Sequence, residues 1–118
     1  MRYLLVLTWF TVPLLGSTGC DTGAASSQTA AQPVVDLNFN LEPEGVIRVA
    51  RALERFDLMW LEVDLFDPGA LAHVRRSVPM PICSGENLYT LRQFRPFLEQ
   101  GAFDVASVDV IWNGFHQA

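Results

Sequence analysis

The sequence predicts an α/β fold in which helices cover a parallel sheet. Short hydrophobic runs alternate along the chain with segments whose apolar residues recur at helical spacing. The predicted strands are almost continuously apolar, as expected when both faces of a parallel sheet are buried. Half of the 118 residues are hydrophobic and 18% are charged, which suits the core of a single domain.

The first part of the chain has a different character. Residues 1–20 place Arg2 before an apolar run that ends in small residues, which is the layout of a secretory signal. The run is short and is interrupted by Thr11 and Pro13, which argues against a membrane span. We therefore expect a leader. The alternative is a hydrophobic segment that is not a signal.

The end of this leader loosely resembles a bacterial lipoprotein cleavage box, in which Cys20 would receive the lipid. Residues 21–33 are small and polar and predict a flexible linker. The folded domain is then expected to span residues 34–118.

The first two strand–helix repeats follow the linker. Residues 34–37 form a short apolar strand, and Pro43 suits the first turn of the helix that comes next. The inward positions of this helix recur at helical spacing: Val46, Val49, Ala50, Leu53 and Phe56. Residues 58–61 predict the next strand, and Asp67 is placed to cap a helix over residues 69–76.

Two further repeats complete the pattern. Residues 78–83 predict a strand, and residues 88–99 predict a helix that Pro96 weakens and Gly101 ends. Residues 103–110 predict the last strand. The pattern therefore contains strands and helices in strict alternation.

An acidic residue stands at the end of each predicted strand. Asp36, Glu62, Glu86 and Asp109 are separated by 26, 24 and 23 residues. One repeat of a (β/α)₈ TIM barrel needs about that length, so we predict a partial barrel with these acids on the rim where such folds carry their active sites. A single loop acid would mean little, but converging carboxylates need a cation such as magnesium to offset their repulsion.

The segments around these acids carry a family resemblance. Residues 36–38 (Asp-Leu-Asn), 60–62 (Trp-Leu-Glu), 84–87 (Ser-Gly-Glu-Asn) and 108–110, followed by Trp-Asn-Gly at 112–114, occur in the order of four family motifs. The chain resembles the barrel domain of the enolase superfamily, on the mandelate racemase and muconate lactonizing side.

The match covers about 84 residues, from Val34 to Gln117. It implies that the four repeats correspond to barrel strands three to six. The loop after Glu62 departs from the family pattern, because Val63 and Asp64 stand where another acid or glutamine and then a proline are usual.

The resemblance implies a site and a cofactor. Asp36, Glu62 and Glu86 would hold one Mg²⁺ ion, which would bind a substrate carboxylate and stabilise the charge formed when the neighbouring carbon loses a proton. Asn38 and Asn87 would hydrogen-bond the substrate or support the ligands.

The proton-abstracting base is the missing part. By the resemblance, Asp109 would orient a histidine on strand seven, and the chain stops after strand six. The family's lysine bases have no counterpart, since the chain contains no lysine. His116 is badly placed for this role, and His73 lies within a predicted helix as a surface or packing residue.

The resemblance thus implies a Mg²⁺-dependent dehydratase, racemase or cycloisomerase acting on a small carboxylate such as a sugar acid, incomplete as it stands. The alternatives are a non-catalytic metal-binding barrel fragment and an exported lipoprotein with an unrelated binding role. The net charge of −5 argues against a nucleic-acid partner. Open barrel edges favour a homo-oligomer. The family implies a cytoplasmic location, whereas the leader indicates export or anchoring.

Overall fold

The computed structural model describes residues 4–6 and 32–114. Its strands form one parallel sheet in the order β1-β5-β4-β3-β2. The strands are β1 (Leu4–Val6), β2 (Val34–Asp36), β3 (Trp60–Glu62), β4 (Ile82–Ser84) and β5 (Val105–Ser107). From β2 to β5 each strand lies beside the next one in the chain, as in a barrel wall.

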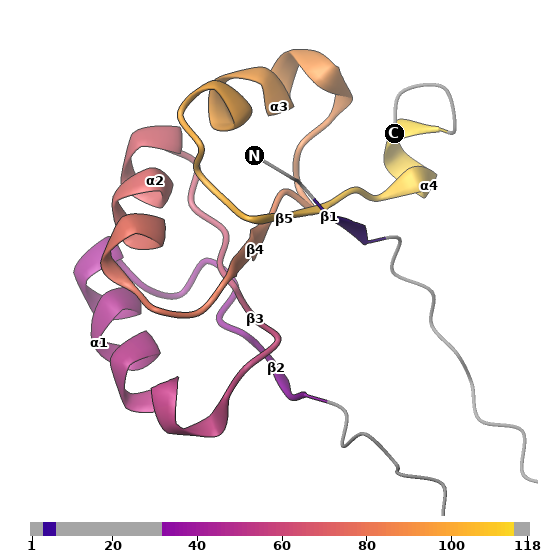
Figure 1. The fold of residues 1–118 in the computed structure, drawn as a ribbon. Coiled ribbons are helices and arrows are strands. Elements are labelled where there is room, and N and C mark those ends of the chain that lie inside the picture. The colour runs from indigo at the N-terminus through magenta and orange to yellow at the C-terminus, as the bar shows by residue number, and fades with distance from the viewer. Residues whose placement is uncertain (1–3, 7–31, 115–118) are drawn as a thin grey trace, which may run out of the picture.

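Helices connect the successive strands. They are α1 (Pro43–Leu53), the short 3₁₀ helix η1 (Glu54–Phe56), α2 (Pro68–Ser77), α3 (Thr90–Glu99) and α4 (Val110–Asn113). Figure 1 shows α1, α2 and α3 following one another along one side of the sheet. The predicted α/β fold, a partial barrel of alternating strands and helices, is therefore confirmed.

Local signals set the helix boundaries. Pro43 and Pro68 each stand in a first helical turn, where the missing N–H costs no hydrogen bond. The Asp67 side chain caps α2 by accepting hydrogen bonds from the N–H groups of Gly69 (3.0 Å) and Ala70 (3.2 Å). Gly101 adopts a φ of 59° just after α3 and so ends that helix.

The hydrophobic core lies between the helices and the sheet. Its largest fully buried side chains are Phe103, Leu61, Leu71, Ile82, Val46, Val63 and Val74. Leu61 and Ile82 come from the centre of the sheet, and Leu71 and Val74 come from the inner side of α2. Burial of these apolar surfaces holds the repeats together.

The strands are shorter than the sequence predicts. The last strand was expected over residues 103–110, but β5 covers only Val105–Ser107, and Val110 already belongs to α4. The strand expected over residues 78–83 begins at Ile82, because Pro79 and Pro81 have no N–H for a strand ladder. Apolar runs in this chain therefore include buried loop residues next to the strands.

The predicted leader contributes a described element. Leu4–Val6 forms β1, which pairs with β5 in parallel register from Leu4 opposite Val105 to Val6 opposite Ser107. Cys20, residues 21–31 of the predicted linker and His116 lie outside the described residues. The leader, lipidation and linker assignments stay predictions. No helix in the described part of the chain is long and apolar enough to cross a membrane.

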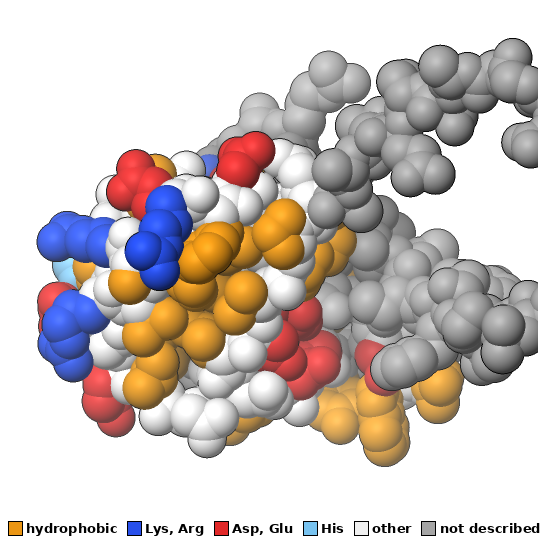
Figure 2. Space-filling view, turned by 90° about the horizontal axis from the view of Figure 1, so that it is seen from below, with side chains coloured by type: hydrophobic (Ala, Val, Ile, Leu, Met, Phe, Trp, Pro, Cys, Tyr) orange, Lys and Arg blue, Asp and Glu red, His pale blue; other side chains and the backbone are white. Residues whose placement is uncertain are grey.

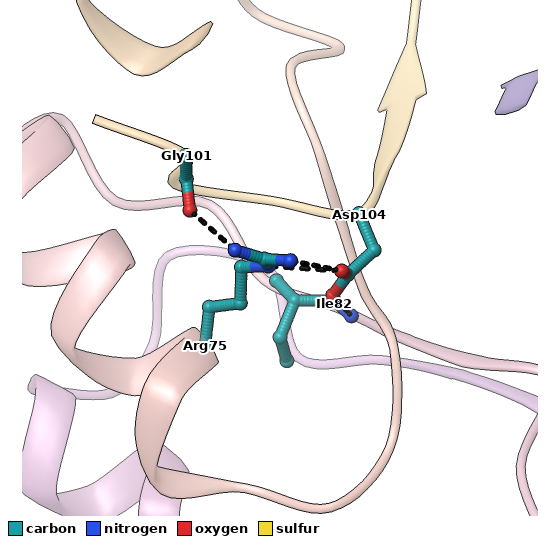
Figure 3. Close-up of polar contacts among 4 residues, drawn as sticks. All are labelled: Arg75, Ile82, Gly101 and Asp104. Carbon is teal, nitrogen blue, oxygen red and sulfur yellow. Dashed lines mark hydrogen bonds and ion pairs between the residues drawn. The ribbon is translucent and has the colours of Figure 1, made fainter. Parts of the chain in front are cut away.

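A polar network ties α2 to the amino-terminal ends of β4 and β5 (Figure 3). Arg75 donates to Asp104 Oδ1 from Nε (2.9 Å) and Nη2 (2.7 Å), and to the carbonyl of Gly101 from Nη1 (3.1 Å). The other carboxylate oxygen of Asp104 accepts from the backbone N–H of Ile82 (3.1 Å). This network lies at the end of the sheet opposite the acidic rim.

Hydrophobic side chains also gather on the surface. Figure 2 shows a patch of them on one face, with basic side chains on one flank and acidic side chains near its margins. The exposed large hydrophobic residues of the described part are Val34, Phe39, Phe56, Met59, Phe66, Tyr89, Leu91, Ile111 and Trp112. Exposed apolar surface agrees with the expectation of an open barrel, and the homo-oligomer stays a prediction.

Candidate metal centre

The acidic rim is built at the carboxyl ends of β2, β3 and β4. Asp36 and Glu62 are the last residues of β2 and β3 and face each other in the parallel register. Glu86 follows the end of β4 by two residues, and Asp64 follows the end of β3 by two residues. Asp36, Glu62, Asp64 and Glu86 thus stand at the same edge of the sheet.

Glu62 has the most perturbed carboxyl group of the rim. Its pKa is raised from 4.5 to about 7, first by burial and then by the charges of Asp36, Asp64 and Glu86. Asp36, Asp64 and Glu86 therefore lie close enough to Glu62 for their negative charges to act on its carboxyl group.

The same four acids also affect the buried thiol of Cys83. Cys83 stands opposite Glu62 in the sheet, and its pKa is raised to about 12 by burial and then by Glu62, Asp64, Asp36 and Glu86. Because the same four acids act on a thiol in the sheet, their charges converge on this end of β3 and β4.

Each predicted asparagine lies beside an acid. Asn38 donates to Asp36 from its backbone N–H (2.7 Å, to Oδ1) and from Nδ2 (3.0 Å, to Oδ2), and its φ of 49° is the left-handed conformation that asparagine tolerates. Asn87 Nδ2 donates to Glu86 Oε1 (3.2 Å). These bonds orient the two acids, and the predicted contacts of both asparagines with substrate stay predictions.

Asp109 and Glu86 both differ from the prediction that they end strands, because Asp109 stands two residues after β5 and Glu86 two residues after β4. Asp109 is the N-cap of α4 and accepts from the N–H groups of Ile111 (2.7 Å) and Trp112 (3.3 Å) at Oδ1. The pKa of Glu86 is raised first by burial and then by neighbouring charges, among which Asp109 is the weakest contributor. The role of Asp109 in orienting a base stays a prediction.

His73 lies within α2, with Nε2 3.0 Å from Glu44 Oε1 on the surface. This agrees with the expectation that His73 is a surface residue rather than a metal ligand.

The chemistry of the rim fits a hard divalent cation. The donors are carboxylate oxygens, the type that Mg²⁺ prefers, and their mutual repulsion is the kind of strain that a cation relieves. As the side chains stand, no group of three or more His, Cys, Asp or Glu residues in residues 4–6 and 32–114 is close enough to hold a metal.

Two residues of the site region were missed by the sequence analysis. Asp64 was noted as a departure from the family pattern but was given no role. Asn113 is buried and joins α4 to the loop after β4, since it accepts from the N–H of Thr90 (2.6 Å) and donates to the carbonyl of Leu88 (3.1 Å). The sequence signal for Asp64 was its place just after the Trp-Leu-Glu motif, and the signal for Asn113 was its place within the Trp-Asn-Gly segment.

Comparison with known proteins identifies the family of this chain and several of its relatives. The family model described as enolase C-terminal domain-like matches residues 24–118. The chain is 35% identical over 79 residues to the 3,6-anhydro-alpha-L-galactonate cycloisomerase of Streptomyces coelicolor, covering 65% of this chain and 22% of that protein. It is 37% identical over 78 residues to the L-rhamnonate dehydratase of Saccharopolyspora erythraea, covering 63% and 20%.

Solved structures share the fold. The crystal structure of a Burkholderia xenovorans protein, provisionally assigned as an L-alanine-DL-glutamate epimerase and bound to magnesium and fumarate, matches with a TM-score of 0.69 and 50% identity. The match covers 71% of this chain and 21% of that one. The chain thus spans about a fifth of the length of these relatives, which include enzymes of isomerase and dehydratase type. The chain belongs to the enolase C-terminal domain-like family, on its mandelate racemase and muconate lactonizing side.

Proposed function

We propose that Asp36, Glu62 and Glu86 bind Mg²⁺ and that this rim is the metal-holding part of an enolase-superfamily lyase or isomerase. One observation carries the proposal: Asp36 and Glu62 end adjacent strands in the same register, and Glu86 follows the end of the next strand. The raised pKa of Glu62 supports the proposal, because after burial its causes are the charges of Asp36, Asp64 and Glu86.

The protein's own residues would hold and orient the ion. Asn38 keeps both oxygens of Asp36 hydrogen-bonded at the rim, and Asn87 does the same for one oxygen of Glu86. Bound there, Mg²⁺ would supply Lewis-acid stabilisation of negative charge on a substrate carboxylate. The reaction would also need a base to remove the proton beside that carboxylate. Asp109 would not itself be this base, because its Oδ1 already accepts hydrogen bonds that cap α4.

The relatives favour a sugar acid as the substrate class. The two curated relatives are named for galactonate and rhamnonate substrates, and the magnesium-bound Burkholderia structure contains fumarate. All three are carboxylates, and a carboxylate can share the coordination of a hard cation with protein oxygens. By the family resemblance, the reaction would include loss of the proton beside such a carboxylate.

Calorimetric titration with Mg²⁺ tests the metal site. Wild type should bind one ion, and Glu86→Gln should weaken binding by at least about tenfold because it removes a charged ligand. Glu54→Gln is the matched control, since Glu54 is exposed and lies before β3, at the other end of the sheet. Equal affinity in wild type and Glu86→Gln would refute the shared site.

Turnover is tested separately on a panel of sugar acids with Mg²⁺. Consumption of a sugar acid that is lost in Glu86→Gln and retained in Glu54→Gln would support the enzyme. Stoichiometric Mg²⁺ binding without turnover by any oligomer would instead support the non-catalytic metal-binding fragment.

A further inference from the structure

Asp64 is a buried carboxylate to which neither the fold nor the proposed ligand set gives a role. Its side chain is only 4% exposed, although it stands in the loop that leaves β3. Oδ1 accepts a hydrogen bond from the hydroxyl of Ser84 (3.1 Å), the last residue of β4. This bond joins the loop after β3 directly to the point where β4 turns towards Glu86.

The turn after β4 has an unusual backbone. Gly85 has a φ of +114°, a value that residues other than glycine rarely adopt. A Cβ at this position would lie 2.8 Å from the Phe94 side chain and 3.2 Å from the carbonyl oxygen of Ser107. The carbonyl of Gly85 accepts from the N–H of Leu88 (3.0 Å). Glu86 itself is exposed, so its position depends on how firmly this turn is held.

The second oxygen of Asp64, Oδ2, is buried without a well-formed hydrogen bond among the described residues. Burial raises the pKa of this carboxyl, and the nearby Ser84, Gly85 backbone and Glu86 oppose that rise. Asp64 borders a cavity of about 40 Å³ that is also lined by Phe39, Phe66 and Gly85. The rings of Phe39 and Phe66 stack with centroids 4.8 Å apart. An under-bonded carboxylate beside aromatic rings lowers stability, and an apolar residue of similar size would avoid that cost. The fold alone does not account for Asp64.

We propose that Asp64 is a positioning residue: its bond to Ser84 holds the Ser84–Gly85–Glu86 turn and thereby keeps the Glu86 carboxylate at the rim. The role of Glu86 as a ligand rests on the proposed function, whereas the holding of the turn does not. The geometry supports this division, because Asp64 is enclosed and hydrogen-bonded while Glu86 is exposed to an incoming ion.

The competing interpretation makes Asp64 a metal ligand itself. Asparagine separates the two, because Asp64→Asn keeps an oxygen that accepts from Ser84 and removes the charge that a ligand needs. A positioning role predicts that Asp64→Asn stays within about threefold of wild type in Mg²⁺ affinity, while Asp64→Ala loses about tenfold. A ligand role predicts equal losses in both variants, similar to that of Glu86→Gln.

Amide hydrogen exchange at residues 85–88 gives a second, metal-free readout. We expect at least about tenfold faster exchange in Asp64→Ala and a smaller increase in Ser84→Ala, because each removes one side of the bond that holds the turn. Asp57→Asn is the matched control, since Asp57 is an exposed acid whose φ of 49° suits asparagine. It should leave both exchange and Mg²⁺ affinity unchanged.

The outcomes separate the two proposals. Unchanged exchange at residues 85–88 in both Asp64→Ala and Ser84→Ala would overturn the positioning role. Absence of Mg²⁺ binding in wild type would refute the proposed function and leave the exchange result to decide the role of Asp64. If Asp64→Ala does not fold, Ser84→Ala and Asp64→Asn carry the same comparison.

Discussion

Asp36 and Glu62 end adjacent parallel strands and face each other in the same register, so two carboxylates share one edge of the sheet. No positive side chain lies among the causes that shift the pKa of Glu62, which are burial and three neighbouring acids. The fold therefore places negative charges together at a cost in stability, which is expected where a cation is to bind.

The first prediction concerns the pH dependence of stability. The pKa of Glu62 is about 7 in the folded protein against 4.5 in the unfolded chain, so folding favours the protonated acid. This contribution to the free energy of unfolding is fully present below pH 4.5 and is lost as the pH rises through 7. We expect Glu62 to contribute a loss of roughly 1–3 kcal/mol over this range, since solvent screening reduces the full effect.

Urea denaturation between pH 4.5 and 8 without metal measures this loss. Glu62→Gln should flatten the dependence, because glutamine does not titrate, and Glu54→Gln should not. Added Mg²⁺ should restore wild-type stability at pH 8 by binding the folded state. An equally steep dependence in Glu62→Gln would contradict the assignment to Glu62.

The second prediction concerns the turn that carries Glu86. Gly85→Ala should cost roughly 2–4 kcal/mol, because the added Cβ meets Phe94 and the backbone of Ser107 in a conformation that alanine disfavours. Gly114→Ala is the control, with a φ of 68°, a ψ of 157° and no described atom within 4 Å of the added Cβ. It should cost less than Gly85→Ala, because it adds backbone strain without a steric clash. Thermal denaturation compares them, and similar losses would show that packing at Gly85 is unimportant.

The third prediction concerns the Arg75–Asp104 pair. Both side chains are largely buried, at 25% and 33% exposure, and Asp104 also accepts from the backbone of Ile82. Asp104→Ala should lower the free energy of unfolding by about 1–3 kcal/mol, because it removes the two hydrogen bonds that Arg75 donates to Asp104 and the one donated by the Ile82 N–H.

The surface pair formed by His73 and Glu44 provides the contrast. These side chains are 51% and 71% exposed, so Glu44→Gln should change stability by no more than about 0.5 kcal/mol. Urea denaturation of both variants checks the comparison. A loss in Glu44→Gln as large as that in Asp104→Ala would mean that burial does not set the strength of these pairs.

The fourth prediction concerns Asn113, which bonds to the N–H of Thr90 and the carbonyls of Leu88 and Asp109. Asn113→Ala should cost about 1–3 kcal/mol and speed exchange of the Thr90 amide, because it removes the hydrogen-bond partners of the part-buried Thr90 N–H and Leu88 carbonyl. Asn40→Ala removes a single exposed bond and should have little effect. Unchanged exchange at Thr90 would exclude Asn113 as the link to α4.

The sequence alone determined the order of elements and the strands that carry the rim acids. Residues such as Leu61 and Val74 are apolar at strand or helix spacing, and Pro43, Asp67 and Gly101 mark helix ends through their own backbone chemistry. These signals are local, so they can be interpreted without knowing which segments meet.

Only the tertiary structure decided how those residues interact. Asp109 became a helix cap rather than a strand end, Asp64 became buried against Ser84, and residues 4–6 joined the sheet beside β5. Each outcome depends on a contact between residues at least 20 positions apart or on a competing local hydrogen bond. The cap formed by Asp109 and the burial of Asp64 both follow from how the segments pack together. Local sequence patterns do not specify that packing.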